Sequence, residues 1–89
     1  MKATRVLYEG YVQGVGFRWT TKRLAHGYDV TGWVRNLPDG RVELQVSGED
    51  DELSAFLRAI RESTLGGHIS AEHKTDIELS SPFKGFRII

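Results

Sequence analysis

The sequence contains no cysteine, which excludes disulfide cross-links, thiolate nucleophiles and cysteine-ligated metal sites. It has only two prolines, and no uninterrupted apolar run exceeds three residues. A disordered proline-rich chain and a membrane-spanning helix are therefore not expected. Because Met1–Ala3 lead into no signal-peptide core, we expect a cytoplasmic location.

The chain also lacks an excess of charge of either sign. Twelve Lys and Arg residues balance twelve Asp and Glu residues, so the formal net charge is zero. Nucleic-acid-binding domains usually carry a clear basic excess, and this balance argues against such a partner. The two halves differ, however, because residues 1–48 hold seven basic and four acidic residues, whereas residues 49–89 hold five and eight. The basic excess of the first half suits an anionic ligand.

A length of 89 residues allows one domain with one core, so we expect a single domain over residues 1–89. Alternation of apolar and polar residues predicts several strands that are each solvated on one side. A strong turn at Leu37–Gly40 joins the middle two strands into a hairpin. The predicted strands are Thr4–Val12, Val30–Asn36, Arg41–Ser47 and His68–Leu79, with a last alternation at Lys84–Ile89.

Two segments have the period of an amphipathic helix. The first begins at Phe17, and Gly27 is expected to end it. The second begins at the acidic run Glu49–Glu52, which stabilises the positive end of a helix dipole, and Gly66–Gly67 are expected to end it. The order β-α-β-β-α-β predicts a ferredoxin-like α+β sandwich. Its antiparallel sheet would have four strands, with room for a short fifth, and both helices on one face.

The residue types common in nucleophilic and metal catalysis form no recognisable pattern. No serine lies in a G-x-S-x-G sequence, and His26, His68 and His73 lack the spacing of metal ligands. The histidines are expected at the surface. The acidic run Glu49–Glu52 is expected to stabilise the start of its helix rather than to bind a metal ion.

A glycine-rich segment is the strongest candidate site. Gly10–Arg18 runs from a strand through a loop into a helix N-terminus. Successive backbone N–H groups and the helix dipole can converge there on an anion. The guanidinium of Arg18, in the first helical turn, matches two oxygens of a phosphate or carboxylate. An ordinary tight turn with a surface arginine is the alternative, and the Walker spacing is absent.

The second candidate is Asn36, which closes a strand just before the hairpin turn. Its amide can donate and accept hydrogen bonds, so it could hold a water molecule or cap the turn. Strand alternation sends Arg35 and Asn36 to opposite faces. We therefore expect Arg35 on the solvent side beside Trp33, and only Asn36 in a site with Arg18.

The segments Gly10–Arg18 and Gly32–Glu43 resemble, almost letter for letter, the two signature motifs of the acylphosphatase family. The resemblance covers nearly the whole chain and implies the same ferredoxin-like fold. It implies hydrolysis of the carboxyl–phosphate bond of acyl phosphates to a carboxylate and inorganic phosphate, which is also expected to inhibit. It implies no metal and no cofactor.

The same resemblance assigns roles to individual residues. Backbone N–H groups of the loop cradle the phosphate, Arg18 binds the phosphoryl oxygens, and Asn36 positions the attacking water. Thr64–Ile69 lack a proline-containing turn common in the family, and Glu72–Ser81 are unusually polar, which leaves the strand there undefined. The expected phosphate-binding residues are Gln13, Gly14, Val15, Gly16, Phe17 and Arg18.

Two other functions are alternatives. A non-catalytic module of the same fold would bind phosphate or carbamoyl phosphate without turnover, whereas an enzyme would release phosphate. An RNA-binding sheet could use Tyr8, Tyr11 and Trp33, but the charge balance argues against it. We expect a monomer that acts on a small-molecule acyl phosphate, with no nucleic-acid or membrane partner.

Overall fold

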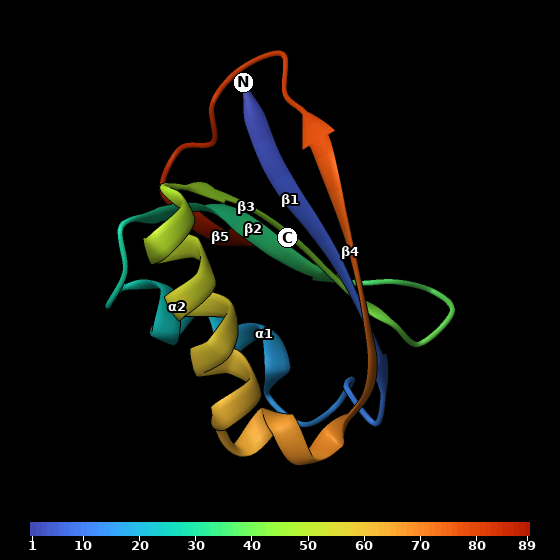
Figure 1. Cartoon of the computed structure of the whole chain (residues 1–89). Helices are drawn as coiled ribbons and strands as arrows, with labels where there is room; N and C mark the ends of the chain where they lie inside the picture. Colours follow the sequence, from blue (N-terminus) through green and yellow to red (C-terminus); the bar gives the residue numbers. More distant parts are fainter.

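The computed structural model describes all 89 residues, and its elements follow the predicted order with a fifth strand added. The two main helices lie on one face of the sheet, as expected (Figure 1). Neither is long and apolar enough to cross a membrane. The elements are β1 (Lys2–Gly10), α1 (Phe17–Ala25), β2 (Val30–Asn36), β3 (Val42–Gly48), α2 (Asp50–Glu62), the 3₁₀ helix η1 (Thr64–His68), β4 (Ile69–Glu78) and β5 (Phe86–Ile88).

The sheet has the strand order β4-β1-β3-β2-β5. β1 pairs antiparallel with β3 and β4, and β2 pairs antiparallel with β3, which confirms the four-stranded antiparallel sheet. The polar segment after the second helix forms the edge strand β4, paired with β1 along the length of β1. The chain then returns across one end of the sheet to the opposite edge (Figure 1), where β5 pairs parallel with β2. The complete sheet is therefore mixed.

The core fills the space between the helices and one face of the sheet. Phe17, the first residue of α1, is buried against Tyr8 of β1 with ring centroids 5.0 Å apart. Burial of one such side chain contributes roughly 1.5–3 kcal/mol, so Phe17 anchors the beginning of α1 to the sheet. The buried apolar residues are Val6, Tyr8, Val12, Phe17, Ala25, Val34, Val42, Leu44, Val46, Phe56, Leu57, Ile60 and Leu65.

Gly27 directly follows the C-cap residue of the first helix, as predicted, but it lacks the left-handed conformation that is common at that position. α1 ends at Ala25, His26 keeps a right-handed helical conformation, and Gly27 has no positive φ. The N–H of Gly27 donates to the carbonyl of Leu24 at 3.0 Å, a bond of the 3₁₀ type. Because this tighter turn satisfies the terminal carbonyl, no left-handed residue is needed.

The second helix ends at Glu62 rather than at Gly66–Gly67, which corrects the predicted boundary. Ser63 is extended and breaks the helix; its hydroxyl donates to Ile60 and accepts from the N–H of Leu65. Gly66 instead lies within η1, where a Cβ atom would stand 1.9 Å from the carbonyl oxygen of Arg61. This glycine allows η1 to pack closely against the end of α2.

In the alternating strand Arg41–Ser47, Glu43 falls on the polar face and is expected to face solvent, but it is buried on the helix-free face of the sheet with 2% of its surface exposed. Its carboxylate accepts hydrogen bonds from Arg5 (2.5 Å), Arg35 (2.7 Å) and Gln45 (3.1 Å). Burial alone would raise the pKa of Glu43, but these three donors hold it below its ordinary value. Arg35 also stacks on Trp33, 5.1 Å from the ring centroid, which confirms its predicted place on this face.

Candidate active site

The glycine loop between β1 and α1 depends on residues in the left-handed region. Gly14 has φ 79° and Gly16 has φ 77°, a conformation that side-chain-bearing residues rarely adopt. A Cβ atom on either glycine would meet nothing within 4 Å, so the backbone conformation, and not lack of space, calls for glycine. Gly16 is also the N-cap of α1, and its carbonyl accepts the N–H of Thr20 at 2.9 Å. The loop therefore turns directly into the helix N-terminus.

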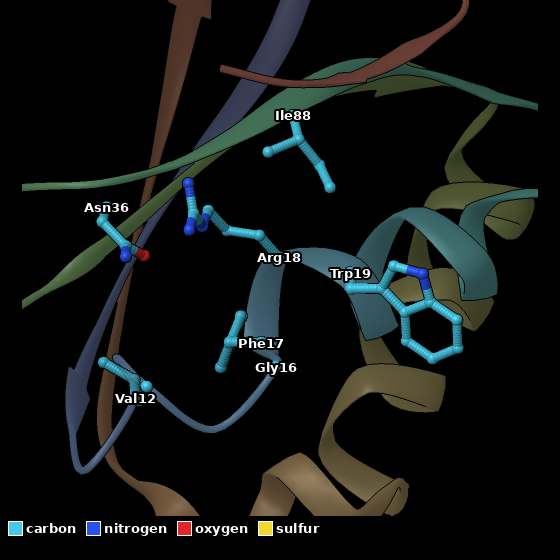
Figure 2. Close-up of a pocket in the computed structure, with 8 residues that line it drawn as sticks. Val12, Gly16, Phe17, Arg18, Trp19, Asn36 and Ile88 are labelled. Carbon is cyan, nitrogen blue, oxygen red and sulfur yellow. The ribbon is translucent and has the colours of Figure 1, made fainter.

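A cavity of about 210 Å³ opens between this loop and the end of β2. Figure 2 shows the side chain of Arg18 extending from the first turn of α1 toward Asn36, at the end of β2. Residues from two separate sequence motifs thus meet in one cavity. The lining residues are Val12, Gly14, Gly16, Phe17, Arg18, Trp19, Asn36 and Ile88.

The side-chain amide of Asn36 makes no hydrogen bond within the protein. The turn that it could have capped is held by Asp39 instead, whose carboxylate accepts the N–H of Arg41 at 3.1 Å. That hydrogen bond and the Arg41 guanidinium lower the pKa of Asp39. The amide of Asn36 is therefore free to contact a molecule in the cavity.

The structure brings together most of the predicted phosphate-binding residues, with two exceptions. Gln13 does not line the cavity, because its amide donates to the carbonyls of Leu37 (2.7 Å) and Arg41 (2.9 Å). Val15 packs against the core instead. Gln13 thereby ties the loop to the β2–β3 turn, a role that its sequence position did not indicate.

Two walls of the cavity were missed by sequence reasoning. Trp19 follows Arg18 directly, and its 61% exposure is unusual for tryptophan. Ile88 comes from β5, so only the parallel pairing of β5 with β2 brings it to the site. The position of Trp19 next to Arg18 was a signal that the sequence offered, whereas nothing in the sequence pointed to Ile88.

The charges around the cavity favour an anion. Arg18 has no carboxylate within 4.0 Å, and no acidic residue lines the cavity. The first turn of α1 holds no acidic residue, whereas that of α2 holds three. The positive end of the α1 dipole is therefore not neutralised by the chain itself.

The histidines lie outside this site. His26, His68 and His73 are all exposed, and His73 contacts Glu9 on the neighbouring strand. No cluster of His, Asp and Glu that could hold a metal ion occurs in the structure. The cavity is lined by one guanidinium, that of Arg18, and one side-chain amide, that of Asn36.

Comparison with known proteins identifies relatives over the whole chain. The acylphosphatase family model matches residues 4–88. The acylphosphatase of Geobacillus kaustophilus is 39% identical over 89 residues, covering 100% of this chain and 95% of the relative. That of Methanospirillum hungatei is 46% identical over 66 residues, covering 74% and 72%.

Solved structures agree with the sequence match. The acylphosphatase of Bacillus subtilis superposes with a TM-score of 0.88 at 30% identity, covering 100% of this chain and 99% of that one. HypF of T. kodakarensis gives a TM-score of 0.88 at 31% identity, but the match covers only 12% of that longer protein. With a family match from residue 4 to residue 88 and full-length relatives at this identity, the chain belongs to the acylphosphatase family.

Proposed function

We propose that this protein hydrolyses acyl phosphates in the cavity between the glycine loop and Asn36. Membership of the acylphosphatase family supports the reaction, and one structural observation supports the site. Arg18 and Asn36 face the same cavity at the N-terminus of a helix that carries no acidic residue. The cavity therefore combines an anion-binding end with a neutral amide that can orient water.

In this proposal the phosphoryl group binds at the N-terminal end of α1. The backbone N–H groups of the loop and of the first helical turn donate to its oxygens, and the guanidinium of Arg18 covers two of them. The tie between Gln13 and the β2–β3 turn keeps the loop fixed relative to Asn36. Binding donors are thus held in place before substrate arrives, which lowers the cost of reorganisation.

The chemical step needs little beyond the positioning of water and the phosphoryl group and the stabilisation of charge. A water molecule held by Asn36 attacks phosphorus, and the bond from phosphorus to the acyl oxygen breaks. The electron pair leaves with the carboxylate, a good leaving group that needs little protonation. Because no acidic residue lines the cavity, the water's proton passes to a phosphoryl oxygen of the substrate itself. Arg18 and the loop stabilise the charge on the equatorial oxygens.

The proposal also covers the domain organisation, the oligomeric state, the substrate and the inhibition by product. Residues 1–89 act as one domain around the single core, and the protein works as a monomer on a small-molecule acyl phosphate, with inorganic phosphate as an inhibiting product. The expected cytoplasmic location stays a prediction. The RNA-binding alternative loses one of its candidate residues, because Tyr8 is fully buried.

Hydrolysis of benzoyl phosphate in the presence of EDTA tests the proposed function. We expect enzyme-dependent loss of substrate that EDTA leaves unchanged and that added inorganic phosphate inhibits competitively. The non-catalytic alternative predicts phosphate binding by calorimetry with no rate above the uncatalysed one. That second result would overturn the proposed function.

A further inference from the structure

A second cavity lies beside the first and shares two of its walls. Its volume is about 270 Å³, and Trp19 and Ile88 border both cavities. In Figure 2, Ile88 lies over α1 with Arg18 to one side and Trp19 to the other. We call this second cavity the α1 groove; its lining residues are Trp19, Lys22, Arg23, His26 and Ile88.

The groove follows one face of α1 away from the phosphate-binding end. Trp19, Lys22, Arg23 and His26 have the spacing i, i+3, i+4 and i+7, which places their side chains on one side of a helix. With a rise of about 1.5 Å per residue, Lys22 and Arg23 lie about 6–7.5 Å along the helix axis from Arg18. That separation matches a short carbon skeleton between two anionic groups.

The cationic side chains of the groove have no acidic side-chain partner. Elsewhere in the first half of the chain the arginines have acidic partners: Arg5 and Arg35 pair with Glu43, and Arg41 pairs with Asp39. Lys22 and Arg23 have no carboxylate within 4.0 Å, and the nine residues of α1 include no acid. The basic excess of residues 1–48 is therefore concentrated on α1, where it has no acidic side-chain partners.

Two of the five residues that line the groove are apolar and exposed. Trp19 is 61% exposed and Ile88 is 38% exposed, and both rank among the few large apolar side chains that the fold leaves uncovered. The guanidinium of Arg23 lies 5.4 Å from the centre of the Trp19 ring, which holds that ring in place by a cation–π contact. The groove thus offers flat apolar surface next to cationic side chains.

We propose that the α1 groove binds the acyl portion of the substrate and favours acyl groups that carry a second anionic group. This inference rests on the proposed function. With the phosphoryl group on Arg18, the acyl chain extends over Ile88 and Trp19, and its terminal anion contacts Lys22 and Arg23. Contacts with a distant part of the substrate also help to hold the reacting bond in place.

Two substrates that differ only in this second anion provide the test. Benzoyl phosphate has none, whereas 4-carboxybenzoyl phosphate carries a carboxylate on the far side of its ring. After subtraction of the uncatalysed rates, we expect kcat/KM to be about fivefold higher for the carboxylated substrate, the upper range for an exposed ion pair. The double variant Lys22→Gln/Arg23→Gln should bring this ratio to about 1.

Arg58→Gln is the matched control, because Arg58 is an exposed arginine on α2 that lines no cavity. It removes one positive charge, and the substrate ratio should stay as in the wild type. Lys22→Glu should lower the ratio below 1, which supplies a second variant if the double one folds poorly.

Three outcomes would overturn the inference: a wild-type ratio at or below 1, a ratio that the double variant preserves, and a ratio that Arg58→Gln lowers as much. In each of these cases hydrolysis of benzoyl phosphate itself would leave the proposed function standing. Failure of the wild type to hydrolyse either substrate would instead remove the proposed function, and the groove's role with it.

Discussion

At the scale of single residues, Arg18 has no acidic partner and projects into the cavity opposite Asn36. Replacement by Ala should weaken phosphate binding at least about tenfold and lower kcat/KM about 10²–10³-fold, as for loss of one preorganised donor in other enzymes. The thermal midpoint should stay close to that of the wild type, because Arg18 is exposed. Calorimetry with inorganic phosphate and kinetics with benzoyl phosphate give these values.

Arg58→Ala is the control for that variant, since it removes an arginine that is also exposed, from the other helix. Its phosphate affinity and turnover should match those of the wild type. Equal losses in both variants would mean that only the overall charge matters, and Arg18 would have no specific place in the mechanism.

Glu43 is the residue whose environment departs most from its sequence pattern. It is buried and accepts hydrogen bonds from Arg5, Arg35 and Gln45. Glu43→Gln should lower the free energy of unfolding near neutral pH by about 1–3 kcal/mol, because charged donors lose a charged acceptor. Denaturant unfolding measures the difference, and Glu62→Gln, at an exposed position on α2, should change little.

The effect of Glu43 should depend on pH in a defined direction. Its pKa in the folded protein lies below the ordinary value of 4.5. The ionised carboxylate therefore stabilises the fold fully above that value, and the stabilisation is lost as pH falls through the folded pKa. The stability gap between wild type and Glu43→Gln should stay constant from about pH 7 to about pH 5 and shrink as the pH falls further below the ordinary pKa of 4.5. A gap that widens on acidification would contradict the ion-pair interpretation.

At the scale of elements, the position of η1 depends on one glycine. A Cβ atom on Gly66 would stand 1.9 Å from the carbonyl oxygen of Arg61, whereas on Gly67 it would meet nothing within 4 Å. Neither residue has a positive φ, so backbone strain is absent in both. Gly66→Ala should therefore cost about 1–3 kcal/mol from overpacking, and Gly67→Ala less than about 0.5 kcal/mol. Thermal unfolding of the pair measures this, and equal effects would refute the close approach.

The elements themselves were largely predictable from sequence, because hydrophobic period is a local property. The alternation over Val42, Leu44 and Val46 predicted the buried face of β3. The apolar stripe that begins at Phe17 predicted the buried face of α1. Element ends were less predictable, as the end of α2 shows, because the hydroxyl of Ser63 ends that helix before Gly66–Gly67. The parallel pairing of β5 joins strands far apart in the chain, which no local pattern encodes.

At the scale of the whole molecule, a net charge of zero conceals an uneven distribution. Ion pairs neutralise several arginines, whereas the cations of α1 have no acidic partner: Arg18 lies in its first turn, and Lys22 and Arg23 lie in its last. The candidate site, like the fold, could be predicted only in part from the sequence. Arg18 and Asn36 were identified from their motifs, whereas Ile88 and the burial of Glu43 depend on contacts across the sheet.

The fold as a whole brings the glycine loop and one neutral amide together without any acidic residue in the cavity. If positioning of water is the main contribution of Asn36, its loss should affect turnover and leave the binding of phosphate intact. The two properties can be measured on the same variant, which separates catalysis from binding.

The most direct test is therefore Asn36→Ala, with kcat for benzoyl phosphate and the Kd of inorganic phosphate measured side by side. We expect kcat to fall at least about 10²-fold, as for other losses of substrate positioning, while Kd stays within about threefold of the wild type. A kcat close to that of the wild type would contradict the role of Asn36. A parallel loss of phosphate binding would show that Asn36 contributes to the binding site rather than to the chemical step.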